Sequence, residues 1–371
     1  MSISPDELTK RAYEISRRFE KVNTLYLTVM AKQIKDIGKL DADNMHILQQ
    51  MAIMGNNIDE INKELARQTG LALNEIYSIY DESAEGIYND VAYLYKARGI
   101  TQIPFAQNII LQNYINSVKQ LTKGTFINMS NTTNISRSYR DTIDLAIYTV
   151  ATGVDDYQSV MRKMLIDKAQ NGAKVEYASG YKRRLDSACR MNILEGVRQV
   201  NTGIREQCGR EYGADGVEID AHGLCANDHL PYQGKQYSID KYNKLNNELA
   251  RPIGTCNCHH GISYIILGVS PKTYTQSELS QIENYSTKKI TIGDKEVTRY
   301  EASQLMRNAE TKMRYKQDEI VALKKAGFNY KKQEEQLISL KKNYYYISKR
   351  AGLRTRYDRT YVPGYNIKTP K

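Results

Sequence analysis

Histidines and cysteines gather in one short part of this chain. Residues 218–268 hold four of the five histidines and three of the five cysteines, although they make up only about a seventh of the 371 residues. The donors fall into two groups, His222–His229 and Cys256–His260, which are separated by a loop. Imidazole nitrogens and thiolates are the ligands that zinc prefers, and two ligand groups joined by a loop are typical of a tetrahedral site. The sequence therefore predicts a bound zinc ion.

The spacing of the donors narrows the ligand set. Cys258 and His260 are two residues apart and would point to the same side of a strand, whereas His259 would face the opposite side. We therefore predict four zinc ligands with two alternate thiols, namely His222, His229, Cys258 and His260, and Cys225 and Cys256. The alternative interpretation is that these are ordinary buried thiols and loop histidines.

The predicted metal is structural rather than catalytic. A catalytic zinc keeps an open coordination position beside a general base, and the chain has no His-Glu-x-x-His motif and no deaminase motif. It also has no phosphate-binding loop, so nucleotide hydrolysis is unsupported. Asp228 or Glu218 could still act as a base, and a metal-dependent nuclease or hydrolase is the enzyme alternative. Our first hypothesis is a protein without catalytic activity.

Positive charge is concentrated at the end of the chain. Of the formal net charge of +11, residues 341–371 carry nine Lys or Arg and one acid, which gives this tail +8. Such a patch attracts polyanions such as nucleic acid by releasing counterions, although it could also be a solubilising tail. Tyr344, Tyr345 and Tyr346 lie within it and could contact proteins or stack on bases. The predicted contact residues are Lys341, Lys342, Lys349, Arg350, Arg354, Arg356 and Arg359.

The elements that must position these residues are mainly helices. Ser4-Pro5-Asp6-Glu7 is a capping box, and apolar residues spaced by three and four follow it to Gly38. Further helices are predicted over 44–68, with Gly70 as a stop, and over 74–97, 141–152, 157–170, 181–213, 300–326 and 330–350. Residues 100–140 have a looser pattern, with a loop at 128–134. Short strands are predicted at 175–177, 216–221, 235–239 and 262–267, and a hairpin around Gly293.

These elements predict a mainly α protein with one small α+β module. In chain order we expect a helical N-terminal region (1–99), a second helical region after a loop or hinge (100–215), the metal-clasped His/Cys module with short strands (216–270), and a C-terminal hairpin with helices and the basic Tyr-rich tail (271–371). Apolar seams of this kind usually pack within a helical bundle.

The sequence also indicates where the chain is made. Five cysteines is an odd number, so a disulfide framework is not expected and the thiols are predicted to stay reduced. No run of about 18 apolar residues exists, and the first residues lack the order of a signal peptide. We therefore expect synthesis in a cytosol and no contact with a membrane.

The His/Cys module resembles the C-terminal signature of the phage minor capsid protein 2 family, which is grouped with the Mu F-like head morphogenesis proteins. The resemblance rests on His222 to Lys235, with its Tyr-Gln-Gly-Lys end, and on Asn257-Cys258-His259-His260-Gly261-Ile262. It extends to the order of the helices over most of the chain. The family positions that this chain keeps in the module are His222, His229, Gln233, Gly234, Cys258 and His260.

The resemblance implies a structural role in the head of a tailed bacteriophage or prophage. A low-copy minor protein of this kind would lie at the portal vertex or inner shell and aid head assembly or DNA delivery. Its partners would be the portal protein and other head proteins, and packaged DNA through the basic tail. Its location would be the virion, and the host cytoplasm during assembly.

Overall fold

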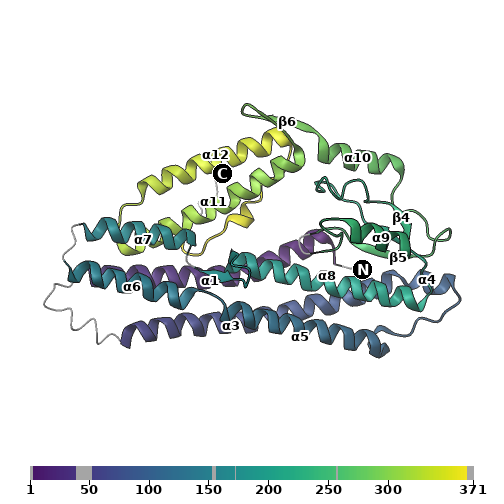
Figure 1. Ribbon diagram of the computed structural model, residues 1–371, viewed down its shortest axis with the longest axis horizontal. Helices are drawn as coiled ribbons and strands as arrows, with labels where there is room; N and C mark the ends of the chain where they lie inside the picture. Colours follow the sequence, from purple (N-terminus) through teal and green to yellow (C-terminus); the bar gives the residue numbers. More distant parts are fainter. Residues whose placement is uncertain (1–2, 39–51, 153–155, 172, 256–257, 366–371) are drawn as a thin grey trace. The chain divides into compact units, whose positions relative to one another are not determined.

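A computed structural model describes residues 3–38, 52–152, 156–171, 173–255 and 258–365 (Figure 1). The described part of the chain is mainly helical, with a few short antiparallel strands. The helices are α1 (Pro5–Ile37), α3 (Ala52–Asp90), α4 (Ala92–Ala97), η2 (Phe105–Gln107), α5 (Ile109–Asn131), α6 (Ile135–Ala151), α7 (Tyr157–Asn171), α8 (Leu185–Glu211), α9 (Ile239–Glu248), α10 (Gln276–Thr287), α11 (Arg299–Ala326), α12 (Lys331–Ala351) and η3 (Tyr357–Thr360).

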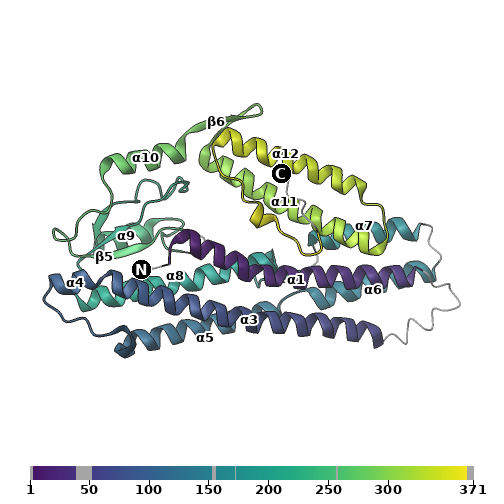
Figure 2. The same cartoon turned by 180° about the vertical axis from the view of Figure 1, so that it is seen from behind.

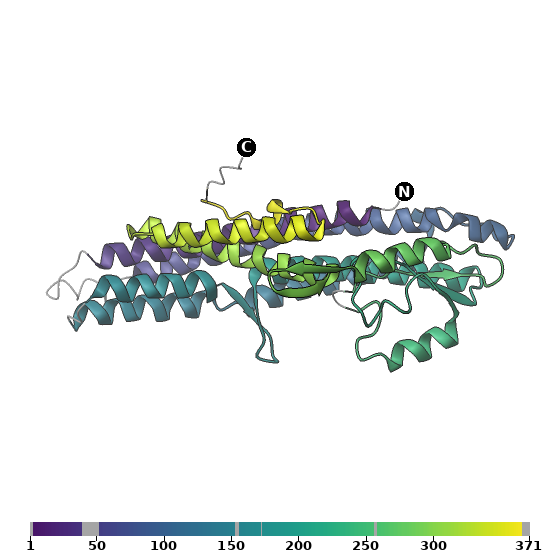
Figure 3. The same cartoon turned by 90° about the horizontal axis from the view of Figure 1, so that it is seen from above.

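The strands are short and all their pairings are antiparallel. They are β1 (Lys174–Glu176), β2 (Lys182–Arg184), β3 (Gly216–Ile219), β4 (Gln236–Ser238), β5 (Ile262–Ile265), β6 (Lys289–Ile292) and β7 (Lys295–Thr298). β1 pairs with β2 and β6 with β7, while β3 lies between β4 and β5 in a three-stranded sheet. In Figure 3 the teal hairpin of β1 and β2 extends away from the helices that flank it in the chain. The short strands predicted in the middle of the chain and the hairpin around Gly293 are confirmed.

The capping box predicted at the start of α1 is present in part. The backbone N–H of Glu7 donates to Ser4 Oγ at 3.2 Å, which satisfies one of the free donors of the first turn. The apolar seam follows as predicted, because Phe19, Val22 and Tyr26 are all fully buried. The helix ends at Ile37, next to the predicted stop at Gly38.

The predicted helix stop at Gly70 is wrong. α3 is continuous from Ala52 to Asp90, and the part of the predicted 44–68 helix before Ala52 lies outside the described residues. A glycine inside a helix costs only about 1 kcal/mol relative to alanine, so a continuous apolar face can outweigh it. Leu65, Ala72 and Ile76 are buried on either side of the glycine and provide that face.

The loose pattern of residues 100–140 conceals a helix. α5 occupies Ile109–Asn131, and its buried apolar residues Leu111, Ile115, Val118, Phe126 and Met129 have helical spacing. Exposed apolar residues of the same helix obscure this pattern in the sequence, among them Ile109, Ile110, Leu121 and Ile127. Two shorter helices, α9 and α10, were also not predicted. Among the described residues, no helix is long and apolar enough to cross a membrane.

The chain divides into two compact units, each built from three separate segments. Unit 1 consists of Met1–Ala12, Leu73–Thr125 and Met191–Gln304, and it contains the three-stranded sheet and α9. Unit 2 consists of Tyr13–Ala72, Phe126–Arg190 and Leu305–Lys371. In unit 2, α11 and α12 lie side by side, as the views from front and back agree (Figure 2). The hydroxyl of Tyr344 on α12 donates to Glu310 on α11 at 2.7 Å.

Unit 2 contains a buried cluster of charged residues. Arg184 donates to Glu20 at 3.0 Å, to Asp186 at 3.0 Å and to Asp318 at 2.9 Å, and all four side chains are at most 8% exposed. Arg314 adds a second guanidinium that contacts Glu20 and Asp186. Buried charges persist only when they are paired and hydrogen-bonded, so this cluster fixes α1, α8 and α11 in one arrangement within the unit.

Candidate metal centre

The sheet of unit 1 brings the two donor groups together. β3 and β5 pair antiparallel with Ile219 opposite Ile262, so the chain leaving β3 lies beside the chain entering β5. The bond from the N–H of Asp220 to the carbonyl of Gly261, at 2.9 Å, continues this pairing. A small apolar core of Val217, Ile219, Ile253 and Ile262 supports the arrangement, and α9 packs against β3 and β4.

Three of the four predicted ligands form one group. Cys258 Sγ lies 3.6 Å from His229 Nδ1 and 3.3 Å from His260 Nδ1. In a tetrahedral site with bonds of about 2.0–2.3 Å, neighbouring ligand atoms are roughly 3.3–3.7 Å apart. Both distances from the thiol sulfur to an imidazole nitrogen are therefore those that one zinc ion would require, and the ligand atoms of the three residues lie within 4.8 Å of one another.

The second ring nitrogen of His229 and of His260, Nε2, has a hydrogen-bond partner in each case. His229 Nε2 lies 2.7 Å from the carbonyl of Arg251, which can only accept, so Nε2 carries the proton. Gln233 Oε1 lies 3.2 Å from His260 Nε2 and also accepts from the backbone N–H of His222 at 3.1 Å. A proton on Nε2 leaves the Nδ1 lone pair free, which is how outer hydrogen bonds prepare a histidine for a metal.

His222 and the alternate thiol Cys225 form a second group with the opposite side of His260. Cys225 Sγ lies 3.4 Å from His260 Nε2, and His222, Cys225 and His260 could also hold a metal. One ion can use only one nitrogen of His260, so the two groups are alternatives that share this residue. His222 Nε2 is buried and has no hydrogen-bond partner within the described part of the chain. The alternate Cys256 lies outside the described residues.

Burial sets the protonation of this cluster. Burial, together with the neighbouring His222 and His229, lowers the pKa of His260 to about 3, so the imidazole is neutral at pH 7. Burial also raises the pKa of the Cys225 thiol to about 12, which keeps this sulfur protonated in the absence of a metal. A neutral imidazole is ready to bind a metal, whereas a protonated thiol must first lose its proton.

The carboxylates of Asp228 and Glu218, the two possible general bases, both have hydrogen-bond partners. Burial alone would raise the pKa of Asp228, but the guanidinium of Arg251, 2.6 Å away, outweighs it and lowers that pKa. Glu218 is 2% exposed, and its carboxylate accepts from Gln236 at 2.7 Å and from the N–H of Thr273 at 3.1 Å. Both carboxylates thus hold loops in place.

The predicted basic contact residues differ in exposure. Lys342, Lys349, Arg350 and Arg354 are exposed, whereas Lys341, Arg356 and Arg359 are half-buried. Arg356 pairs with Asp358 at 3.1 Å, and the Lys341 ammonium lies 5.8 Å from the centre of the Tyr365 ring. Tyr345 and Tyr346 are 49% and 43% exposed. α12 therefore presents a surface that is both basic and aromatic.

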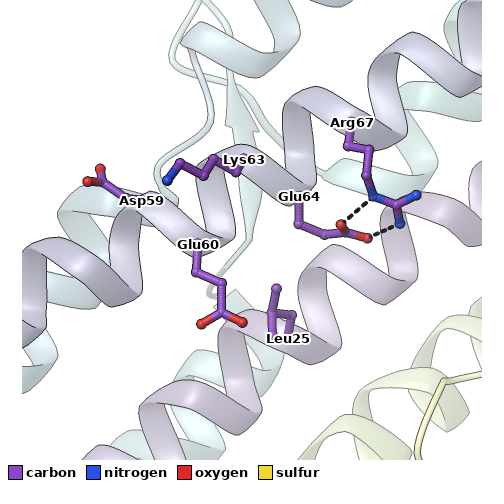
Figure 4. A pocket seen from close by; sticks show the side chains of 6 residues that line it. All are labelled: Leu25, Asp59, Glu60, Lys63, Glu64 and Arg67. Atoms are coloured by element: carbon purple, nitrogen blue, oxygen red, sulfur yellow. Dashed lines mark hydrogen bonds and ion pairs between the residues drawn. The ribbon is translucent and has the colours of Figure 1, made fainter.

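A surface hollow in unit 2 is lined mainly by charged side chains of one helix. Leu25 of α1 and five charged residues of α3 line it (Figure 4), namely Asp59, Glu60, Lys63, Glu64 and Arg67. Glu64 and Arg67 pair across one turn of the helix at 2.7 Å. The charges are mixed and no histidine, cysteine or serine lines the hollow, so we assign it no function.

Fold and site together define a mainly helical protein with a small strand-containing His/Cys module. The profile of one family, phage minor capsid protein 2, matches residues 3–344. The chain belongs to this family, which indicates a structural role in the phage head together with other head proteins, and a location in the virion. No curated protein and no solved structure matches the chain.

Proposed function

We propose that this protein is a non-catalytic minor component of the phage head, placed at the portal vertex or inner shell, in which a zinc ion clasps the His/Cys module. Membership of the capsid family supports the role in the head. The observation that carries the zinc proposal is the convergence of His229 Nδ1, His260 Nδ1 and Cys258 Sγ.

The residues present fit a zinc ion. All three donors are types that zinc prefers, and both distances from the Cys258 sulfur to a histidine nitrogen match a tetrahedral site. The Arg251 carbonyl and Gln233 hold the histidines in the metal-binding tautomer. A four-coordinate ion would need one further ligand besides these three. Bound zinc supplies a fixed positive charge that draws these donors together.

The metal would stabilise a module that has little core of its own. In the described residues its main cluster has four buried apolar residues with partly buried ones packed against them, and the strands have three or four residues each. Zinc would join the loop after β3 to the segment before β5. In small metal modules the binding free energy is about 10 kcal/mol or more, and it contributes directly to folding.

Metal analysis of reciprocal variants tests the zinc proposal. We expect about one zinc per purified chain by elemental analysis, because one ion uses one nitrogen of His260. Cys258→Ser should lose the zinc and melt at a lower temperature. Cys225→Ser should retain the zinc and the wild-type melting temperature. The reverse pattern would move the ligand set to His222, Cys225 and His260. Zinc-free wild type that melts at the temperature of the purified protein would refute the clasp.

The alternative function is a metal-dependent nuclease or hydrolase. The specific observation in its favour is that the three-residue group leaves a coordination position for water. The engagement of Asp228 and Glu218 counts against it, because neither carboxylate is free to accept a proton. Cleavage of plasmid DNA that requires Mg²⁺ or Zn²⁺ and is abolished by His229→Ala would establish the nuclease.

The role in the head is tested separately. Tagged protein captured from phage-producing cells should bring the portal protein and the major capsid protein with it, as identified by mass spectrometry. Recovery of neither, with nucleic acid alone, would contradict the proposed location. This outcome does not depend on whether the module holds zinc.

A further inference from the structure

One stretch of unit 1, at the start of α5 and in the connection before it, carries no charge. Residues 99–118 contain no Asp, Glu, Lys or Arg, although 26% of the chain is charged and about five charged residues would be expected in a stretch of this length. Four isoleucines within it are exposed, by 40% at Ile100, 47% at Ile103, 72% at Ile109 and 60% at Ile110. Single exposed apolar side chains are ordinary on a protein surface, whereas a group of them without charges indicates a contact surface.

The connection that carries these isoleucines is held in place by the helices beside it. The Tyr88 hydroxyl on α3 donates to the carbonyl of Ile103 at 2.8 Å, and the Gln102 side chain donates to the carbonyl of Tyr88 at 2.8 Å. The rings of Phe105 and Tyr88 have their centres 5.5 Å apart, and the carbonyl of Phe105 accepts from Gln112 of α5 at 3.0 Å. The exposed isoleucines therefore lie on a fixed backbone, and a partner would not have to order this segment on binding.

The uncharged surface continues along the exposed side of α5. Helical spacing places the exposed residues that follow Ile109 and Ile110 on the same side of the helix, namely Asn113, Asn116, Ser117, Gln120 and Leu121. The first charged residue after the stretch, Lys119, is paired with Asp81 of α3 at 2.6 Å. We call the four isoleucines and these exposed residues of α5 the uncharged surface. Its polar side chains are amides and a hydroxyl.

We propose that the uncharged surface binds a second copy of this chain and forms a two-fold dimer. In such a dimer the same surface meets itself, so a charge near the axis would face its own copy, whereas an amide has both donors and an acceptor and can pair with its own copy. The net charge of +11 makes two copies repel one another, and an uncharged surface is where they can approach at the least cost.

The charge of the surface also favours a second copy over an unlike protein. An unlike partner of a basic chain would gain affinity by placing acids opposite basic residues, and residues 99–118 offer no basic residue for this. In the dimer the isoleucines would form the apolar centre of the interface and the amides of α5 its polar rim.

Sedimentation velocity of the full chain at tens of micromolar tests the dimer. Wild type should sediment as a species of twice 42.5 kDa that dissociates on dilution. Ile109→Asp/Ile110→Asp buries carboxylates of both copies in the interface and should raise the dissociation constant about a hundredfold or more. Aspartate in the first turn of a helix is favourable, so α5 itself should not be destabilised.

A matched variant on α12 controls for the change of charge. Ile338→Asp/Tyr345→Asp adds the same two acids on an exposed side of that helix and should leave the dissociation constant within about twofold. Both double variants reduce the net positive charge, so a general electrostatic effect would tighten the dimer rather than weaken it.

A milder variant and a salt series guard against misfolding and against association through charge. Asn116→Asp keeps the size of the side chain, adds one charge per chain to the uncharged surface, and should weaken the dimer about tenfold at an unchanged melting temperature. Added salt should leave the dimer intact, because screening acts on charges.

Three outcomes would overturn the proposal. A chain that stays monomeric at every concentration has no such dimer. A dimer that salt dissociates, or that both double variants weaken equally, is not held by the uncharged surface. A monomer that loses captured portal or major capsid protein only in the Ile109/Ile110 variant would assign the surface to another head protein instead.

Discussion

The His/Cys cluster of unit 1 and the Arg184 cluster of unit 2 are both buried and polar, but they are satisfied in different ways. In unit 2 the guanidinium of Arg184 contacts all three carboxylates of its cluster. In unit 1 the Nδ1 atoms of His229 and His260 face a thiol, and His222 Nε2 has no partner among the described residues. The Arg184 cluster contains its own counter-charges, whereas the His/Cys cluster has the ligands for an external ion.

The difference teaches how to separate structural polar clusters from binding sites. Burial and a shifted pKa are common to both clusters, so neither property identifies function by itself. The distinguishing property is whether lone pairs and donors inside the cluster remain unused after every internal contact is counted. In the His/Cys cluster the Nδ1 atoms of His229 and His260 face the Cys258 thiol, and we propose this cluster as a binding site, whereas all three carboxylates of the Arg184 cluster have a guanidinium partner.

Removing Arg184 should have the largest effect. Arg184→Leu leaves Glu20, Asp186 and Asp318 buried with only Arg314 as a cation, so we expect a loss of about 3–5 kcal/mol in the free energy of unfolding. Urea denaturation measures it. Metal chelators should not change this loss of unfolding free energy, because the Arg184 cluster contains no metal ligand set among the described residues. As a control, Glu296→Gln breaks an ion pair whose side chains are 72% and 59% exposed, and it should produce no measurable change. Similar losses of unfolding free energy in Arg184→Leu and Glu296→Gln would show that the buried cluster is no more important for stability than an exposed ion pair.

Gln233→Ala should have a smaller effect that is confined to metal affinity. The variant removes the acceptor at His260 Nε2, so the imidazole is no longer held in the metal-binding tautomer. Zinc affinity should fall by about 10–100-fold, as measured by competition with a chelator. Gln233→Glu keeps an acceptor and should retain the affinity. Unchanged zinc affinity in the alanine variant would show that His260 does not bind the metal through Nδ1.

The two clusters should respond to pH in opposite directions in metal-free protein. Burial raises the pKa of Glu20 from 4.5 to about 8, so the folded state holds an extra proton and this stabilisation is lost as the pH rises from 4.5 to 8. The pKa of His260 falls from 6.5 to about 3, so its contribution is lost as the pH falls below 6.5. Hydrogen-exchange protection between pH 8 and 5 should therefore increase in α11 and decrease in β3 and β5. A change of the same sign in both would contradict this.

Sequence patterns predicted most of the secondary structure where one face of an element is apolar and the other is not. α11 and α12 begin and end within about two residues of the predicted bounds, because their seams are regular and their ends are marked by glycines. α5 was missed because exposed isoleucines and leucines fill the gaps of its buried pattern. Gly70 predicts a helix stop because its small local cost is visible in the sequence, whereas the packing that offsets this cost is not.

The candidate site could be found from the sequence, but its geometry could not. Spacing alone placed His222, His229, Cys258 and His260 together. The structure brings His229 and Cys258 together on the Nδ1 side of His260. Which imidazole nitrogen faces the thiol depends on contacts from Gln233 and Arg251, which lie elsewhere in the module.

The interleaved segments of the two units have a consequence for synthesis. Unit 2 needs residues from 13 to beyond 305, and Glu20 cannot complete its contacts until Arg184 and then Arg314 have left the ribosome. A nascent chain must therefore carry its first helix with an unpaired acid for about half of translation, and closure depends on contacts of very long sequence separation. The order of translation thus makes the last helices the ones that complete the fold.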